Sequence, residues 1–81
     1  MNKIDKLNFD SVPSLWVKRG SLFKENTVDL KDISSIDVSG MAILVKWAKA
    51  QKDQKLHLIN VPVSAMNLIN TYRLGQLFVL D

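Results

Sequence analysis

Residues 27–45, TVDLKDISSIDVSGMAILV, decide the fold of this chain because they join a short strand to an apolar helix. Val28 and Leu30 favour an extended strand on one face of a sheet. Asp37 precedes a stretch without proline in which apolar side chains recur at helical spacing, so its carboxylate is expected to cap a helix. Gly40 leaves the backbone bare at that helix start, which would let a ligand or another chain approach closely.

Outside this segment, short strands alternate with helices, which predicts an α/β fold. No linker, repeat or low-complexity segment divides the chain, so residues 1–81 are expected to form a single domain. The further expected elements are a helix that starts at Asp10 or Ser11, a strand over residues 56–61, a helix from near Pro62 to before Gly75, and a strand over residues 77–80. The first of these helices is expected either to stop at Gly20 or to run on to Phe23 with Gly20 as a weak point.

Two of these helices carry an apolar stripe that is expected to face the core. The stripe residues are Val12, Leu15 and Trp16 in the first helix and Ala65, Leu68, Ile69 and Tyr72 in the last. The helix after Asp37 has an apolar arc that is wider than docking on one sheet requires. Something besides the sheet is therefore expected to cover part of this helix.

The composition narrows the functional classes. With no cysteine, the chain has no disulfide, thiol nucleophile or Cys-ligated metal site, which is compatible with a reducing cytosol. Its net charge of +3 falls short of the clustered basic surface of a nucleic-acid binder. The sequence shows no apolar run long enough to span a membrane and no apolar segment typical of a signal peptide, so we expect neither.

The string at residues 36–42, IDVSGMA, follows Val28-Asp29-Leu30 and opens an apolar helix, and in this it resembles the signature of the STAS family. Members of that family include anti-sigma factor antagonists and the tails of sulfate transporters. The first-helix pair Leu15-Trp16 and the later pattern of Leu68, Tyr72 and Leu74 look most like the small STAS subunit of Mla-type phospholipid ABC transporters. The resemblance implies a small STAS-like mixed sheet with helices alternating with strands.

Two departures from the family pattern have consequences. The regulated antagonists carry a phosphorylated Ser or Thr directly after the motif Asp, whereas this chain has Val38 there, and valine has no hydroxyl. Ser39 follows, but one residue further along a helix start turns the side chain by about 100°. STAS domains also begin with a β-hairpin, and the segment before the first helix has room for one short strand near Lys6 to Phe9. The hairpin is therefore expected to be shortened or absent. The sheet edge that it would leave unpaired is expected either to pair with a second copy in a homodimer or to be covered by the N-terminal segment.

The resemblance implies that the loop and the helix start face a partner protein. The predicted partner-binding residues are Ser34, Ser35, Asp37, Val38, Ser39, Gly40, Met41, Ile43 and Trp47. For Ile43 and Trp47, packing under the first helix is the alternative to partner contact, and for Asp37 it is capping alone. If Gly40 faces a partner, Gly40→Trp is expected to abolish binding while leaving the circular dichroism spectrum near native.

Residues with catalytic chemistry are sparse. His57 is the single histidine, no other ligand stands at metal-binding spacing, and the three glycines form no phosphate-binding motif. We therefore expect no catalytic site, metal or cofactor. The resemblance implies a cytoplasmic, non-enzymatic subunit, peripheral to the inner membrane, that binds and stabilises or regulates the ATPase of an ABC transporter maintaining envelope lipid asymmetry. Two alternatives stay open: an anti-sigma factor antagonist that binds a kinase-like protein, and a small nucleotide-binding protein.

Overall fold

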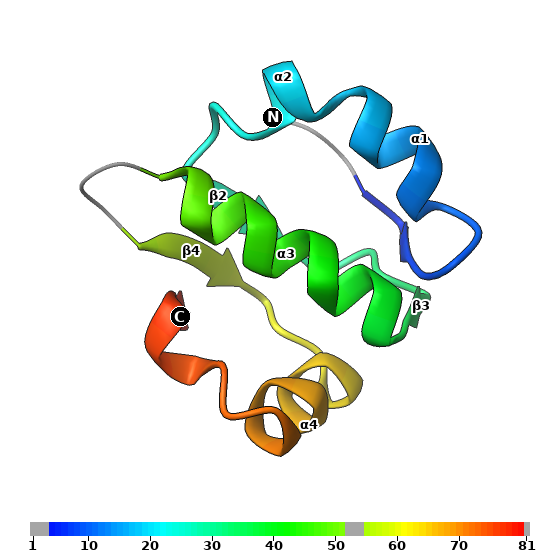
Figure 1. Cartoon of the computed structure of the whole chain (residues 1–81). Coiled ribbons are helices and arrows are strands. Elements are labelled where there is room, and N and C mark those ends of the chain that lie inside the picture. The colour runs from blue at the N-terminus through cyan, green and yellow to red at the C-terminus, as the bar shows by residue number, and fades with distance from the viewer. Residues whose placement is uncertain (1–3, 52–54, 81) are drawn as a thin grey trace.

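The computed structural model describes residues 4–51 and 55–80, and its helices and strands alternate along the chain (Figure 1). The α/β class predicted from the sequence is confirmed. The elements are β1 (Lys6–Leu7), α1 (Val12–Val17), α2 (Arg19–Leu22), β2 (Thr27–Asp29), β3 (Ser35–Ile36), α3 (Val38–Ala50), β4 (Leu56–Ile59), α4 (Val63–Thr71), the 3-10 helix η1 (Gly75–Leu77) and β5 (Phe78–Leu80).

The strands form a three-stranded sheet in the order β2-β4-β5 and a separate pair, β1-β3. Val28 is in register with Leu58, and Leu7 with Ile36. Every strand pair within the described residues is parallel, where a mixed sheet was expected. The difference arises at the N-terminus, where β1 pairs in parallel with β3 and no strand of a hairpin accompanies it in the described part of the chain.

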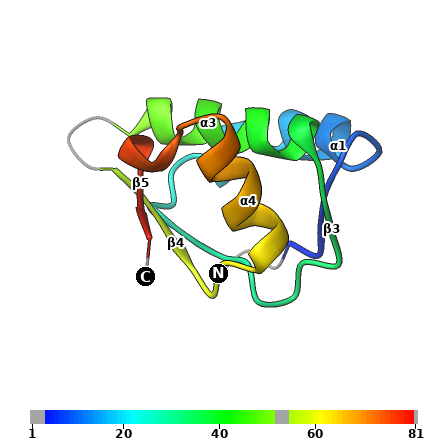
Figure 2. The same cartoon turned by 90° about the horizontal axis from the view of Figure 1, so that it is seen from below.

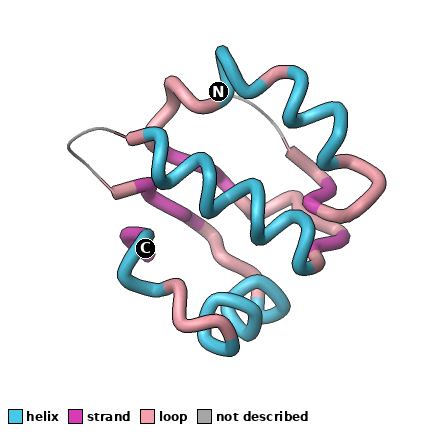
Figure 3. The backbone as a smooth tube through the Cα atoms, viewed as in Figure 1, coloured by secondary structure: helices cyan, strands magenta, loops and turns pink. Residues whose placement is uncertain are grey.

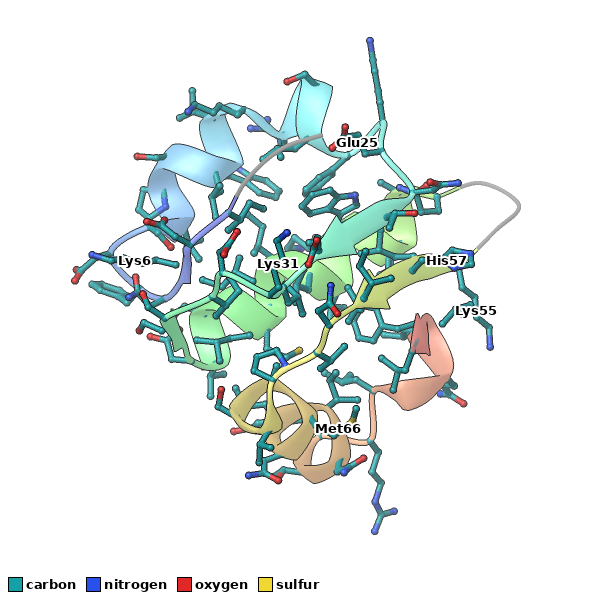
Figure 4. All side chains as sticks on the ribbon, turned by 180° about the vertical axis from the view of Figure 1, so that it is seen from behind. Lys6, Glu25, Lys31, Lys55, His57 and Met66 are labelled. Atoms are coloured by element: carbon teal, nitrogen blue, oxygen red, sulfur yellow. The ribbon has the colours of Figure 1, made fainter. Side chains whose placement is uncertain are left out.

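Helix α3 lies along one face of the three-stranded sheet, between α1 on one side and α4 on the other (Figures 1 and 2). Leu56 and Leu58 of β4 point toward α3 and are fully buried, while the intervening His57 is half-buried. Figure 4 views the opposite face, where Lys31 and His57 are seen with α3 behind the strands. The core therefore sits between α3 and the sheet.

The first predicted helix is divided into two short ones, α1 and α2, separated at Lys18 (Figure 3). Of the two expected ends, the stop at Gly20 is wrong, because Gly20 lies inside α2 and the helical region reaches Leu22, with Phe23 as its cap. The interruption falls at Lys18 rather than at Gly20. Asn8 fixes the start of this region because its side-chain oxygen accepts hydrogen bonds from the backbone N–H groups of Asp10 and Ser11. Helix α1 therefore begins at Val12, one or two residues later than predicted.

Helix α4 follows Pro62 as predicted and ends in a tight C-terminal turn. Arg73 has a φ of 55°, and the N–H of Leu74 donates to the carbonyl of Ile69 at 2.9 Å. This is the arrangement in which a residue in the left-handed region ends a helix and satisfies its last carbonyls. The turn directs the chain back toward β5, so that Phe78 pairs with Leu56.

Candidate functional site

The carboxylate of Asp37 holds the start of α3 against the loop that follows β1. Its Oδ1 accepts a hydrogen bond from the N–H of Gly40 at 3.1 Å, which is the predicted helix cap. Its Oδ2 accepts a second bond from the N–H of Phe9 at 3.0 Å. These N–H groups, that of Phe9 first, hold the pKa of Asp37 below its ordinary value of 3.8. Asp37 thus caps α3 and ties the β1–α1 loop to it with the same side chain.

Gly40 faces the interior, contrary to the sequence-based expectation of a bare surface. A Cβ placed on Gly40 would lie 2.6 Å from the Cβ of Leu7 and would overlap the carbonyl of Leu7. Gly40 is itself buried. The glycine does permit a close approach, but the approaching backbone is β1 of this chain rather than a partner or a ligand. Gly40→Trp is consequently expected to disrupt the fold, which overturns the expectation that it would leave the fold intact.

Ser34 and Ser35 also form hydrogen bonds within the chain, to the segment around β1. The N–H of Ser34 donates to the carbonyl of Asp5 at 2.8 Å, and its hydroxyl donates to the same carbonyl at 3.2 Å. The hydroxyl oxygen of Ser35 accepts a hydrogen bond from the side-chain amide of Asn8 at 3.0 Å. Together with Asp37, these two serines line the edge where β1 joins β3.

Met41, Ile43 and Trp47 are buried within the chain. Trp47 is 2% exposed, its ring stacks on Phe23 with centroids 5.6 Å apart, and its indole N–H donates to the carbonyl of Glu25 at 2.8 Å. Of the two alternatives for Trp47, this geometry matches intramolecular packing. The side chain that covers Trp47 is Phe23, which follows α2, and not a side chain of α1. Helical periodicity in the sequence could not indicate this contact.

The face of α3 that points away from the sheet is largely open, and we call it the outer face: the exposed Val38, Ala42, Lys46 and Lys49 and the half-buried Val45. Val38 is 53% exposed, and no charged side chain lies between it and Lys46. A groove of about 280 Å³ separates this face from Tyr72 and Leu74, after α4. A second groove, of about 210 Å³, separates it from Val12 and Trp16 of α1, with Ser39 in its lining.

Trp16 and Tyr72 border these grooves, although helical periodicity had assigned both to the core. Trp16 is 38% exposed and Tyr72 is 51% exposed. Tyr72 lies at the end of α4, just before the chain turns at Arg73, so the helical stripe no longer dictates which way its side chain points. Sequence analysis also missed Ala42, which faces outward from the middle of the most apolar helix. The residue types themselves could have indicated these positions, because Trp and Tyr are large and amphipathic and are enriched at interfaces.

Asp29 and Asn60 form a second polar contact, away from the start of α3. At the carboxyl ends of β2 and β4, Asp29 accepts hydrogen bonds from the Asn60 side chain at 3.0 Å and from the N–H of Lys31 at 2.9 Å. The Asn60 amide is the larger cause of the lowered pKa of Asp29. Asn60 has a φ of 54°, and its side-chain bond to Asp29 joins the ends of β2 and β4. Within residues 4–51 and 55–80, no cluster of three or more His, Cys, Asp or Glu side chains could hold a metal ion.

In the same described ranges, none of the helices has the length and apolarity to cross a lipid bilayer. Comparison of the chain with family models, with curated proteins and with solved structures finds no match. The STAS resemblance at residues 36–42 is therefore a prediction from the sequence.

Proposed function

We propose that this chain is a non-enzymatic interaction module of the STAS type that docks on a partner protein through the outer face of α3. The observation that carries the proposal is that the helix from Val38 to Val45 carries no charge and exposes Val38 and Ala42 between two apolar grooves. Exposed apolar surface that is flanked by aromatic side chains is typical of binding sites, and Trp and Tyr are the residues that most often dominate their energetics. Trp16 and Tyr72 stand on either side of α3 as such anchors.

The family resemblance supplies the partner. It implies the cytoplasmic ATPase subunit of an ABC system that transports phospholipids and maintains envelope lipid asymmetry. In this proposal the chain is cytoplasmic, peripheral to the inner membrane, and stabilises or regulates the ATPase by holding it. In this role the chain contacts the ATPase and does not itself bind lipid.

The two alternatives from the sequence fare differently. A kinase-like anti-sigma partner would use the same surface, and Val38, exposed at the usual phosphorylation position, supports binding there without phosphorylation. A nucleotide would have used the helix start, where N–H groups attract phosphate. In this chain the carboxylate of Asp37 already accepts a hydrogen bond from the N–H of Gly40 at that site, and its negative charge would repel a phosphate. We therefore rank nucleotide binding below both protein partners.

A matched pair of valine substitutions tests the proposal. Val38 and Val63 are the first residues of α3 and α4, and they are 53% and 77% exposed. An aspartate at either position sits in the first turn of a helix, where negative charge is tolerated. Val38→Asp and Val63→Asp should therefore both fold, as judged by thermal unfolding, while only Val38→Asp inserts a charge into the proposed interface.

The readout is affinity capture from the source cell with quantitative mass spectrometry. We expect the wild type and Val63→Asp to recover an ATPase that carries a P-loop motif together with its membrane permease, and Val38→Asp to recover at most about a tenth as much. Recovery of a kinase-like anti-sigma protein would support the alternative instead. Equal recovery by all three proteins would remove the outer face of α3 from the interface.

A further inference from the structure

A third groove, between α2 and the C-terminal half of α3, is the largest of the three at about 560 Å³. We call it the basic groove. Arg19 and Lys24 line it from the α2 side, and Lys46 and Lys49 line it from α3. Among the described residues that line it, none carries a carboxylate. Cations therefore stand on both banks of one groove in a chain whose net charge is only +3.

The groove has an aromatic floor that is held rigidly. The guanidinium of Arg19 lies 4.3 Å from the ring centroid of Trp16, and it donates a hydrogen bond to the carbonyl of Trp16 at 2.9 Å. The ring of Phe23 meets Trp16 edge-on at 6.2 Å and stacks on Trp47. The side chain of Gln51 donates to the carbonyl of Phe23 at 2.8 Å. A floor fixed in this way can receive an apolar side chain without losing much conformational freedom.

Gly20 lines the groove on the α2 side and, having no side chain, leaves the groove open there. Nothing lies within 4 Å of a Cβ placed on it. Unlike Gly40, it therefore leaves empty space rather than a close contact. An incoming chain could lie over α2 at this point and reach the rings beneath.

The groove continues into the site of the proposed function, because Trp16 and Lys46 line both the basic groove and the groove between α1 and α3. A partner segment that covers Val38 and Ala42 could run past Trp16 into the basic groove. Lys46 and Lys49 are three residues apart on a helix, a spacing at which like charges repel mildly. An acidic segment would relieve that repulsion.

We propose that the basic groove docks an acidic segment of the partner protein, one that carries several carboxylates and at least one large apolar side chain. The inference deepens the proposed function and rests on it. Carboxylates spaced along a peptide would reach the cations on both banks, and the apolar side chain would cover Trp16 and Phe23.

The observations favour such a peptide over two other anionic ligands. A compact phosphate or nucleotide needs convergent N–H donors, whereas the basic groove lies along the last turns of α3, where carbonyls predominate. A membrane surface is broad and binds protruding aromatic side chains, whereas Phe23 is half-buried at the bottom of this groove.

The first test is peptide display on the full chain. Random peptides are selected for binding to the wild type and counter-selected against the double variant Lys46→Glu and Lys49→Glu. A matched control carries the same charge change at Lys6 and Lys55, two exposed residues that do not line the groove and that Figure 4 shows far apart. We expect the enriched peptides to be acidic with a large apolar residue, to bind the control like the wild type, and to bind the groove variant at least about tenfold more weakly.

Neutral or basic consensus peptides, or acidic peptides that bind the groove variant as well as the wild type, would overturn the proposal. So would binding to vesicles of phosphatidylcholine with phosphatidylglycerol that the groove variant loses, in the absence of acidic peptide binders. Trp16 fluorescence in a Trp47→Phe background provides a local readout, since a peptide in the groove changes the surroundings of Trp16 and the control substitutions do not.

Affinity capture with the same variants separates this inference from the proposed function. If Val38→Asp loses the ATPase while the groove variant retains it in full, the interaction module stands and the basic groove is not its acidic-segment site. If both variants lose the ATPase and the Lys6 and Lys55 control retains it, both proposals are supported. If none of the variants loses it, both fail.

Discussion

The inner and outer sides of α3 begin at neighbouring residues and have opposite roles. Gly40 packs on the backbone of Leu7 inside the fold, whereas Val38, two residues earlier, is 53% exposed. Two residues correspond to about 200° of rotation around a helix, which places these positions on opposite faces. A short motif at a helix start can therefore close the fold with one residue and present a docking surface with another. Treating the whole motif as a single surface merges these two roles.

The largest expected effect is on the inner side. Gly40→Ala forces a methyl group against the carbonyl of Leu7, and because the obstacle is backbone it cannot move aside cheaply. We expect a loss of more than about 3 kcal/mol in the free energy of unfolding, measured by urea titration followed by circular dichroism.

Gly20→Ala is the matched control. The added methyl group meets nothing within 4 Å and the residue is in α2, so a gain of roughly 0.5–1 kcal/mol is expected. If Gly40→Ala unfolded at the same urea concentration as the wild type, the inner side would not be closed by β1.

This contrast explains how far the sequence could lead. Local signals found the α/β class, the Asp37 cap and the approximate elements, because capping and periodicity depend on nearby residues. They could not show that Gly40 meets Leu7 or that Phe23 covers Trp47, because those contacts join segments far apart in the chain. The strand β3 was not predicted for the same reason, because Ser35 and Ile36 pair with β1, which is distant in the sequence.

Trp47 in α3 and Trp16 in α1 extend the comparison from the interior to the surface. Trp47→Phe removes the hydrogen bond to Glu25 and leaves space in the core, so we expect a loss of about 1–3 kcal/mol. Trp16→Phe replaces a partly exposed indole by a smaller ring and weakens the contact with Arg19, for a loss below about 1 kcal/mol. Urea titration of the two single variants measures the difference, and a larger loss for Trp16 would contradict the assignment of Trp47 to the interior.

Asp37 joins the two sides, and its effect should depend on pH. Because its pKa is lowered by the N–H groups of Phe9 and Gly40, its contribution to stability is fully present above the ordinary value of 3.8 and is lost as the pH falls through the lower folded value. Asp37→Asn cannot accept both hydrogen bonds with oxygen atoms and does not titrate. We expect the variant to be less stable than the wild type at pH 7 and the two to converge below pH 3.8, measured by thermal unfolding across that range. A difference that is constant over the same range would mean that the carboxylate charge contributes nothing.

The smallest effect is expected on the outer side, at Val38. Val38→Thr keeps the shape of the side chain and places a hydroxyl where water already reaches, so the free energy of unfolding should change by less than about 0.5 kcal/mol. Urea titration beside Gly40→Ala measures this directly. If the change instead approached the loss at Gly40, Val38 would be packed within the fold, and the outer face of α3 could not be the free docking surface. If Val38→Thr leaves the free energy of unfolding nearly unchanged and Val38→Asp loses the partner, Val38 contributes to binding and not to folding.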